Sequence, residues 1–161
     1  MNSTEKKLGV ATHIRWAIRR DMPELLAIEN LSFLRPWSED DLISHLKQRT
    51  VIAMVAEVDC EDVVGYFLYE LKKTKIKILK LAVLPSYRGK SVGRQMISKL
   101  IGKLTFELRN RLVFNVRESN LNGQLFLKRM GFWCEAINPE FFSDTDEDAL
   151  EFVYRFKEGS E

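Results

Sequence analysis

The stretch Arg88-Gly89-Lys90-Ser91-Val92-Gly93-Arg94 decides the predicted fold, because it joins a strand pattern to a helix pattern. The mostly apolar run Ile76–Leu84 leads into it and is typical of a strand. Apolar residues then recur with a period of about 3.6 residues, which predicts a helix from Val92 to about Arg109. The first N–H groups of a helix lack internal partners and attract anions, and glycine lets a ligand approach the backbone. The pattern therefore predicts a phosphate-binding turn between a strand and a helix.

The glycine spacing in this turn excludes two common phosphate-binding motifs. The distance from Gly89 to Gly93 is wrong for the nucleoside-triphosphate loop, G-x-x-x-x-G-K-[ST]. The dinucleotide motif G-x-G-x-x-G is absent. What remains is either another kind of phosphate loop or an ordinary basic turn.

Composition narrows the class of protein. With 161 residues and a formal net charge of +2, the chain is long enough for one domain and gives no global reason to expect nucleic acid or membrane binding. The charges are unevenly placed: residues 71–111 hold twelve Lys or Arg and one acid, whereas residues 138–151 hold six acids and no base. A basic middle suits a polyphosphate ligand and an acidic late loop suits a cationic substrate, although a solvated surface would explain both.

Nothing in the sequence predicts secretion, a membrane span or a metal site. Residues 1–12 are polar, and no apolar run approaches the length of a membrane helix. Cys60 and Cys134 are too few for a disulfide framework and are expected to be reduced thiols. Neither C-x-x-C nor H-E-x-x-H occurs, so no metal ligands are predicted. We expect a cytoplasmic protein.

Periodicity and capping signals predict a single mixed α/β domain at residues 13–157, between a flexible tail at 1–12 and a short tail at 158–161. The spacing predicts a mostly antiparallel sheet of about seven strands with about four helices. Capping pairs are expected at Asp21 with Glu24 and at Ser38 with Asp41. Ser119 or Asn120 is expected to cap a late helix that Gly131 ends. The expected strands are 14–18, 51–58, 63–71, 75–84, 111–116, 132–137 and 150–156, with an acidic loop at 138–148.

The central turn resembles the acyl-CoA loop of the GNAT acetyltransferase superfamily, whose pattern is Q/R-x-x-G-x-G/A. Here it is Arg88-x-x-Ser91-x-Gly93, with Ser91 in place of one glycine. The family's flanking strand is similar to Leu81–Pro85, which precedes the turn. The family's second signature is similar to the later Glu118–Asn120 followed by Met130-Gly131-Phe132.

Two further stretches are similar to the ribosomal-protein alanine N-acetyltransferase group of that family. They are Pro36–Glu39 and Asp146–Ala149. This resemblance implies acetyl-CoA as co-substrate and an amine as acceptor, with a protein N-terminus favoured. The alternatives are a small-molecule amine acceptor and a non-catalytic module that binds acyl-CoA or a peptide. A monomer or weak homodimer is expected.

The resemblance also implies roles for individual residues. The backbone N–H of Val83 would stabilise the oxyanion, and Trp37, Glu39 and Asp148 would lie on the acceptor side. Cofactor binding would fall to Leu81, Val83, Arg88, Gly89, Lys90, Ser91, Val92, Gly93, Arg94 and Asn120.

The catalytic part of the resemblance is incomplete. Leu127 stands where the family usually has a proton-donating tyrosine, and Lys77 and Asn115 stand where branches of the family place a base. One possibility is another carboxylate, with Glu118 preferred over Glu39 and Asp148. A second is no dedicated base, because an α-amine has a pKa of about 7.7–8.0 and is partly neutral at pH 7. The third is a protein without turnover.

The basic segment Lys72–Lys77 admits two interpretations. It could dock on RNA, or its lysines could protect the edge of the sheet as a solvated turn. We favour the second, so nucleic acid is not expected as a partner.

Overall fold

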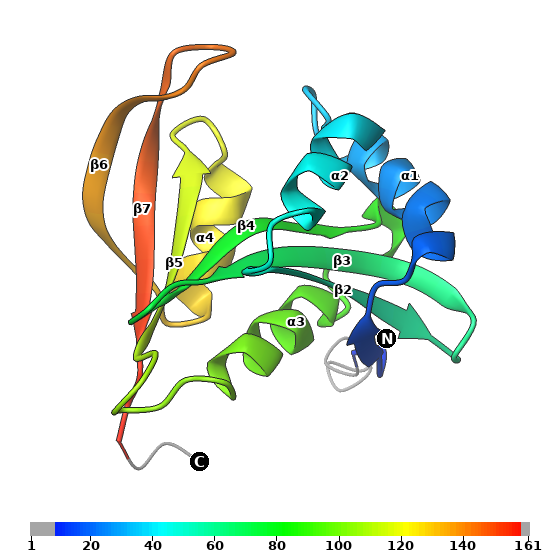
Figure 1. Ribbon diagram of the computed structural model, residues 1–161, viewed down its shortest axis with the longest axis horizontal. Helices are drawn as coiled ribbons and strands as arrows, with labels where there is room; N and C mark the ends of the chain where they lie inside the picture. The colour runs from blue at the N-terminus through cyan, green and yellow to red at the C-terminus, as the bar shows by residue number, and fades with distance from the viewer. Residues whose placement is uncertain (1–8, 159–161) are drawn as a thin grey trace, which may run out of the picture. The chain divides into compact units, whose positions relative to one another are not determined.

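A computed structural model describes residues 9–158 (Figure 1). Within them, the strands and helices occur in the predicted order, β-α-α-β-β-β-α-β-α-β-β. The elements are β1 (His13–Trp16), α1 (Met22–Ser32), α2 (Glu39–Leu46), β2 (Val51–Val58), β3 (Asp62–Leu71), β4 (Ile76–Val83), α3 (Val92–Ile101), β5 (Arg111–Arg117), α4 (Leu121–Arg129), β6 (Trp133–Phe142) and β7 (Glu147–Arg155).

The strands hydrogen-bond in the order β1-β2-β3-β4-β5-β7-β6. β1 is antiparallel to β2, β5 is antiparallel to β7 and β6 is antiparallel to β7, whereas β4 and β5 run parallel. The parallel pair is the one joined by a helix, as a crossover connection requires. The mixed, mostly antiparallel sheet predicted from the sequence is confirmed.

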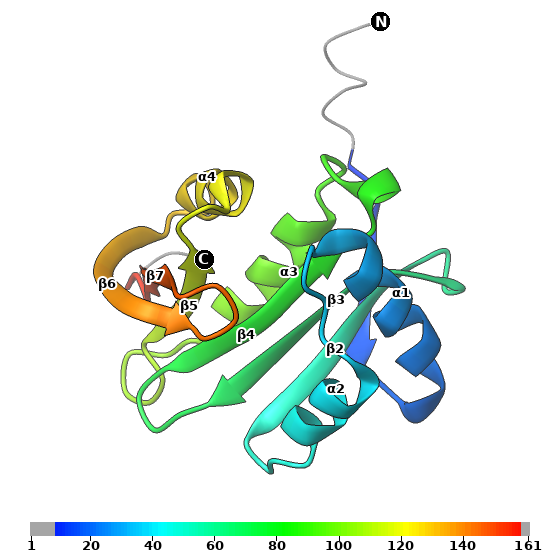
Figure 2. The ribbon, with the colours of Figure 1, turned by 90° about the horizontal axis from the view of Figure 1, so that it is seen from above.

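The chain divides into two compact units, which share strands β3 and β4. Unit 1 contains residues up to Tyr69 together with Lys80–Lys99, and unit 2 contains Glu70–Leu79 and the residues from Leu100 onward. In unit 1, α1 and α2 lie on one face of β2 and β3, and α3 lies on the other (Figures 1 and 2). The helices and the sheet bury apolar side chains between them, chief among them Leu25, Ile28, Leu42 and Met96 from the helices and Tyr66 and Phe67 from β3.

Unit 2 is built on the pairing of β5 with its neighbours. Residues Ile76–Ile78 of β4 pair with Leu112–Phe114, and β7 pairs along the whole of β5. α4 packs beside β5, and its Leu127 is only 1% exposed. None of the helices within residues 9–158 has the length and apolarity needed to cross a bilayer.

The predicted extent of α3 is wrong. The helix ends at Ile101 rather than near Arg109, and Phe106 and Leu108 are 72% and 58% exposed. Gly102 disfavours continuation, and the N–H of Lys103 donates to Leu100 O at 3.0 Å, a bond that spans three residues instead of four. Of the apolar residues that follow Ile101 in the predicted helix, only Leu104 is buried. The apolar pattern in the sequence therefore continues for about two turns beyond the end of the helix.

The predicted acidic loop at 138–148 is also wrong in extent. β6 continues to Phe142 and β7 begins at Glu147, so residues 143–146 alone connect them. β6 is the last strand of the sheet, where unpaired backbone groups and Pro139 are tolerated, and its register shifts twice along its length. The strand was predicted at residues 132–137, but the polar residues that follow gave no alternating pattern, so its continuation to Phe142 was not predicted.

Three of the four capping predictions are confirmed. Ser38 and Asp41 exchange the expected bonds, Asn120 Oδ1 accepts from Gly123 N at 3.0 Å, and α4 ends before Gly131, which has φ +94°. The pairing of Asp21 with Glu24 is wrong, because Asp21 instead accepts from Ile18 N at 2.7 Å and from Arg15.

Candidate active site

The turn between β4 and α3 has the backbone geometry of an anion-binding loop. Gly89 and Ser91 have φ of +73° and +66°, which folds the chain tightly at the start of α3. The first helical hydrogen bond of α3 runs from the N–H of Gln95 to Ser91 O, at 3.0 Å. Val92, Gly93 and Arg94 therefore begin the helix with N–H groups that point along its axis. A Cβ added at Gly89 would meet nothing within 4 Å, so a ligand has room at the turn.

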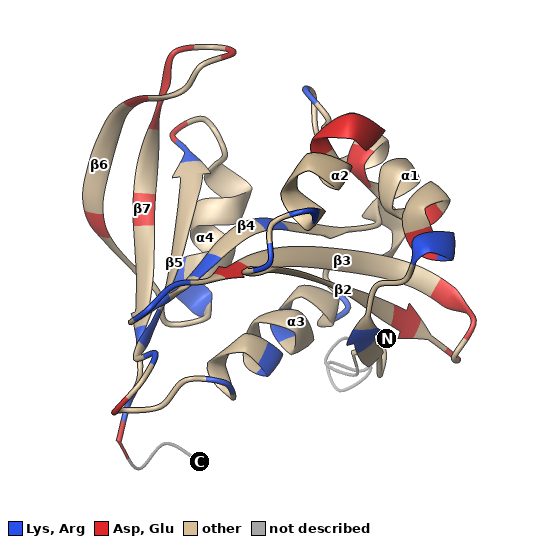
Figure 3. Ribbon diagram, viewed as in Figure 1, with Lys and Arg blue, Asp and Glu red and all other residues tan. Residues whose placement is uncertain are grey.

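Three exposed cationic side chains surround this turn. Arg88 Nε donates to Val83 O at 3.2 Å, which holds the guanidinium beside the end of β4. Lys90 Nζ lies 5.3 Å from the ring centre of Tyr87. Arg94 points from the first turn of α3, whose basic residues are blue in Figure 3. Together with the helix dipole, these charges favour a polyanionic ligand.

Gln95 is a site residue that the sequence analysis missed. Its Nε2 donates to Val10 O at 2.6 Å and to Ser91 Oγ at 3.3 Å, and its Oε1 accepts from Thr12 N at 3.0 Å. Val10 N in turn donates to Lys90 O at 2.9 Å. The residues that come after Leu8 thus brace the turn and help to hold Ser91 at a positive φ that disfavours a side chain. A polar residue inside the apolar pattern of α3 was the available signal.

Of the predicted N-terminal tail, residues 1–8 lie outside the described part of the chain, as do residues 159–161 of the C-terminal tail. Gly9 lies so close to the turn that a Cβ on it would sit 1.8 Å from Ser91 Oγ.

The predicted acceptor-side residue Trp37 is held by a buried charge cluster in unit 1. Its backbone N–H donates to Glu29 Oε2 at 2.6 Å, and Glu29 is fully buried. Lys80 Nζ lies 3.2 Å from Glu29 Oε1, and the Tyr66 hydroxyl donates to the same carboxylate. Burial, and then the bond to Glu29, raise the pKa of Tyr66. Three donors thus satisfy a carboxylate that would otherwise be costly to bury.

The ring of Trp37 is enclosed by its neighbours. Lys80 Nζ lies 4.3 Å from the Trp37 ring centre and 4.0 Å from that of Phe33. The imidazole of His45 stacks on the Trp37 ring, with ring centres 4.3 Å apart. Glu39, predicted to lie on the acceptor side, is exposed in the acidic first turn of α2 (Figure 3). The indole is therefore fixed in place before any ligand arrives.

The predicted site residues of unit 2 serve its local structure. Asp148 Oδ1 accepts from Glu140 N at 2.9 Å and so supports the β6–β7 hairpin. Glu118 is exposed, and its carbonyl accepts from Gln124 Nε2 at 2.9 Å. Asn120 caps α4 with its side chain. None of these contacts prevents a ligand role, and none requires one.

The acids near the β6–β7 turn are paired. Arg117 makes a two-pronged bond to Asp144, at 2.9 and 2.7 Å. Ser119 Oγ donates to Glu147 Oε2 at 2.6 Å, and this bond lowers the pKa of Glu147. Arg117 thus offsets part of the negative charge of this segment, and the bond from Ser119 orients Glu147 without changing its charge. Among residues 9–158, no group of three His, Cys, Asp or Glu side chains is placed to hold a metal ion.

A strand, a positive-φ turn and a helix N-terminus meet at the end of β4, and this arrangement suits a phosphate-bearing ligand. Residues 22–132 match the model of the Acetyltransferase (GNAT) family. The chain belongs to this family.

Three individual proteins show how the chain resembles others. It is 27% identical over 112 residues to the ribosomal protein bS18-alanine N-acetyltransferase of Haemophilus influenzae, covering 70% of this chain and 75% of that one. It is 26% identical over 164 residues to an N-alpha-acetyltransferase of Sulfurisphaera tokodaii, covering 93% and 97%. Its fold matches that of Arabidopsis thaliana NAA60, crystallised with acetyl-CoA, with a TM-score of 0.75, 17% identity and coverage of 90% and 99%.

Proposed function

We propose that this chain transfers the acetyl group of acetyl-CoA to the α-amine of a protein N-terminus. The observation that carries the proposal is the turn at residues 88–94, where two positive-φ residues open the start of α3 to a diphosphate. The names of the relatives support the donor and the kind of acceptor. N-acetyl transfer is the chemistry of the family to which the chain belongs.

The proposed roles of the loop residues depend on their positions. The N–H groups from Gly89 to Arg94 would hold the diphosphate, with Arg88, Lys90 and Arg94 adding charge. Leu81 and Val83 lie on the last residues of β4, where the pantetheine arm would add alongside the strand and the Val83 N–H would face the oxyanion. Asn120 would donate its side-chain amide to the arm.

The chemistry needs a neutral amine whose nitrogen bonds to the thioester carbon as the carbon–sulfur bond breaks. An α-amine with a pKa of about 7.7–8.0 is about one-tenth neutral at pH 7, whereas a lysine amine with a pKa of about 10.4 is neutral in about one molecule in a few thousand. A site without an effective general base therefore favours N-terminal amines as acceptors over lysine side chains. Glu118 remains the proposed base, with Trp37, Glu39 and Asp148 on the acceptor side.

A second candidate function is a module that binds acyl-CoA or a peptide without turnover. Leu127 favours it, because it is buried in the core of unit 2 and has no proton to donate. A small-molecule amine as acceptor is a third possibility, which the same experiment addresses.

The test is release of free CoA thiol when acetyl-CoA is incubated with peptides bearing free N-termini, N-blocked lysine peptides and small amines. The proposal expects thiol release with the free N-termini, rising between pH 7 and 9 as the α-amine deprotonates. Tight acetyl-CoA binding with no release on any amine would establish the module instead. Release with small amines alone would assign a small-molecule enzyme.

We also propose that the protein works in the cytoplasm as a monomer or weak homodimer. Cys60 and Cys134 are free and exposed, which suits a reducing compartment.

A further inference from the structure

A groove in unit 2 brings together opposite charges that no part of the proposed acetyl transfer uses. Its volume is about 600 Å³, within the range of ligand sites. Its lining comes from the β3–β4 hairpin and from β4, β5, β6 and β7, and its polar side chains are those of Lys72, Lys75, Lys77, Asn115, Asn138 and Glu151.

The acidic end of the groove is the carboxylate of Glu151, which a hydrogen bond holds in position. Glu151 on β7 pairs directly with Asn115 on β5. The side-chain amide of Asn138 donates to Asn115 Oδ1 at 2.8 Å and to Glu151 Oε2 at 3.1 Å. Within residues 9–158, the other carboxylate oxygen of Glu151 has no hydrogen-bond or ion-pair partner. That oxygen is therefore available to a donor that enters the groove, such as an ammonium group.

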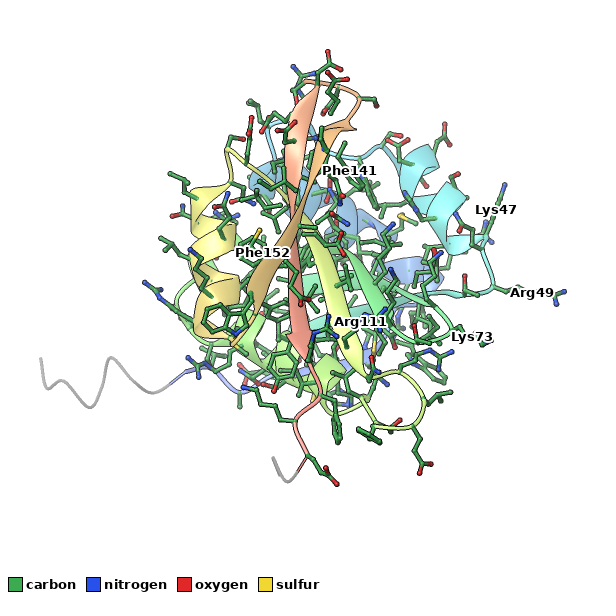
Figure 4. The ribbon with its side chains drawn as sticks, turned by 90° about the vertical axis from the view of Figure 1, so that its left-hand side faces the viewer. Lys47, Arg49, Lys73, Arg111, Phe141 and Phe152 are labelled. Carbon is green, nitrogen blue, oxygen red and sulfur yellow. The ribbon has the colours of Figure 1, made fainter. Side chains whose placement is uncertain are left out.

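The basic end is formed by the β3–β4 hairpin and the start of β4. Lys75 and Lys77 alternate with the buried Ile76, so both project to the same face of the strand. Both are half-buried, and neither has an ion-pair partner in the described part of the chain. Lys72 is the third lysine at the groove, and it pairs with Glu70. Figure 4 shows Arg111 at the start of the neighbouring strand β5, which adds to the positive charge at this end.

The distance between the basic and acidic ends of the groove can be spanned by a short peptide. Lys77 pairs with Val113, and Val113 pairs with Val153, two residues beyond Glu151 on β7. Two strand spacings and two residues place the Cα atoms of Lys77 and Glu151 about 12 Å apart, and their side chains shorten this gap. A ligand with a positive and a negative group a few ångströms apart would satisfy both ends at once.

We infer that this groove binds the N-terminus of an acceptor protein whose first few residues are acidic, with the α-amino group at Glu151 and the acidic side chains at the three lysines. This inference rests on the proposed function and specifies its substrate class. An N-terminus with basic residues at its next positions would be repelled by the same lysines, and the aromatic ring of Phe141 offers apolar contact at the acidic end (Figure 4).

The experiment compares two peptides that begin with alanine and differ in having glutamate or lysine at positions 2 and 3. For the unmodified protein, kcat/KM measured by thiol release is expected to be at least tenfold higher for the glutamate peptide. The triple variant Lys72→Glu, Lys75→Glu and Lys77→Glu should reverse this preference. The matched control, with Lys73, Lys103 and Lys128 changed to Glu, alters net charge equally on exposed residues outside the groove and should keep it.

The variant Glu151→Gln tests the acidic end. It should raise KM about tenfold for both peptides and leave the Kd for acetyl-CoA unchanged, since the amide retains the shape of the side chain but not its charge. Circular dichroism and the thermal midpoint verify that each variant is folded.

The outcomes separate the inference from the proposed function. The inference is overturned, while acetyl transfer stands, if kcat/KM is equal for the two peptides. It is also overturned if the triple Lys→Glu variant keeps the preference for the glutamate peptide. Fluorescence anisotropy of labelled peptides, with the protein saturated with CoA, gives a readout without turnover. Selective binding of the acidic peptide with no thiol release would support the groove and refute acetyl transfer, and binding without selectivity would overturn the groove as well.

Discussion

The polar networks of the two units differ in how deeply they are buried. In unit 1, the carboxylates of Glu29 and Asp21 are buried and saturated with donors. In unit 2, the pairs of Arg117 with Asp144 and of Arg155 with Glu135 lie at the surface. The buried charges of unit 1 therefore stabilise its fold, whereas its candidate ligand site is formed by backbone N–H groups and the exposed cations of the turn at residues 88–94. The surface charges of unit 2 contribute little to the free energy of unfolding, so they can be changed without unfolding the protein. Charged groups at the surface are also available to a ligand.

The largest expected effect tests the backbone loop of unit 1. Gly93→Glu places a side chain and a negative charge at the start of α3, where the N–H groups converge. We expect acetyl-CoA binding to be lost, with Kd raised at least a hundredfold in isothermal titration calorimetry. The same substitution at Gly102, an exposed residue just after α3, changes the charge equally and should leave Kd unchanged. Unaltered affinity in the Gly93 variant would rule out the loop as the diphosphate site.

The second prediction tests whether unit 1 depends on its buried charge. Glu29→Gln removes the charge that Lys80 faces, and breaking a buried ion pair costs about 3–5 kcal/mol of unfolding free energy. Urea denaturation measures this loss. Glu24→Gln, on the exposed side of the same helix, should change stability by less than about 0.5 kcal/mol.

The double variant Glu29→Gln, Lys80→Met sharpens this prediction. Removing both charges should recover much of the lost stability, because no buried charge is left without its partner. If the double variant were as unstable as the single one, packing rather than charge would explain the effect.

The third prediction concerns pH. The side-chain bond from Arg15 lowers the pKa of Asp21, with a further contribution from the Ile18 N–H. A carboxyl whose pKa is lower in the folded state stabilises the protein above the unfolded pKa of about 3.9, and this contribution is lost as pH falls through the folded value. Asp21→Asn should therefore cost about 2 kcal/mol at pH 7, and this cost should shrink as pH falls below about 3.9. Denaturation curves at several pH values would show two stability profiles that converge in acid; parallel profiles would contradict the assignment.

The same contrast explains what the sequence could predict. The turn at residues 88–94 is built from consecutive residues, and its backbone geometry depends on local glycine and serine positions. The capping of α2 and α4 is equally local. Such features leave a pattern within a few residues, so the fold and the position of this turn between β4 and α3 could be predicted.

The groove of unit 2 could not be derived in this way. Lys77, Asn115 and Glu151 come from three separate strands and meet only through the register of β4, β5 and β7. Asn138 joins them because β6 extends past its predicted end, along an edge strand with two register shifts. Long-range pairing and edge irregularity leave no short-range signal. The local signal for Gln95 was its polarity within the apolar pattern of α3, and its partners Val10 and Thr12 lie more than eighty residues away.

The smallest expected effect tests the surface network of unit 2. Arg117→Ala removes the two-pronged bond to Asp144, but both side chains are about one-third exposed, with relative areas of 30% and 31%. Exposed pairs contribute about 0.2–1 kcal/mol, so the loss of unfolding free energy should stay within about 1 kcal/mol. A double-mutant cycle with Asp144→Ala isolates the coupling from the contact of Arg117 with the Phe142 ring, 4.1 Å away. A coupling energy above about 2 kcal/mol would mean that the β6–β7 turn relies on its charges as unit 1 does, and the contrast between the units would fail.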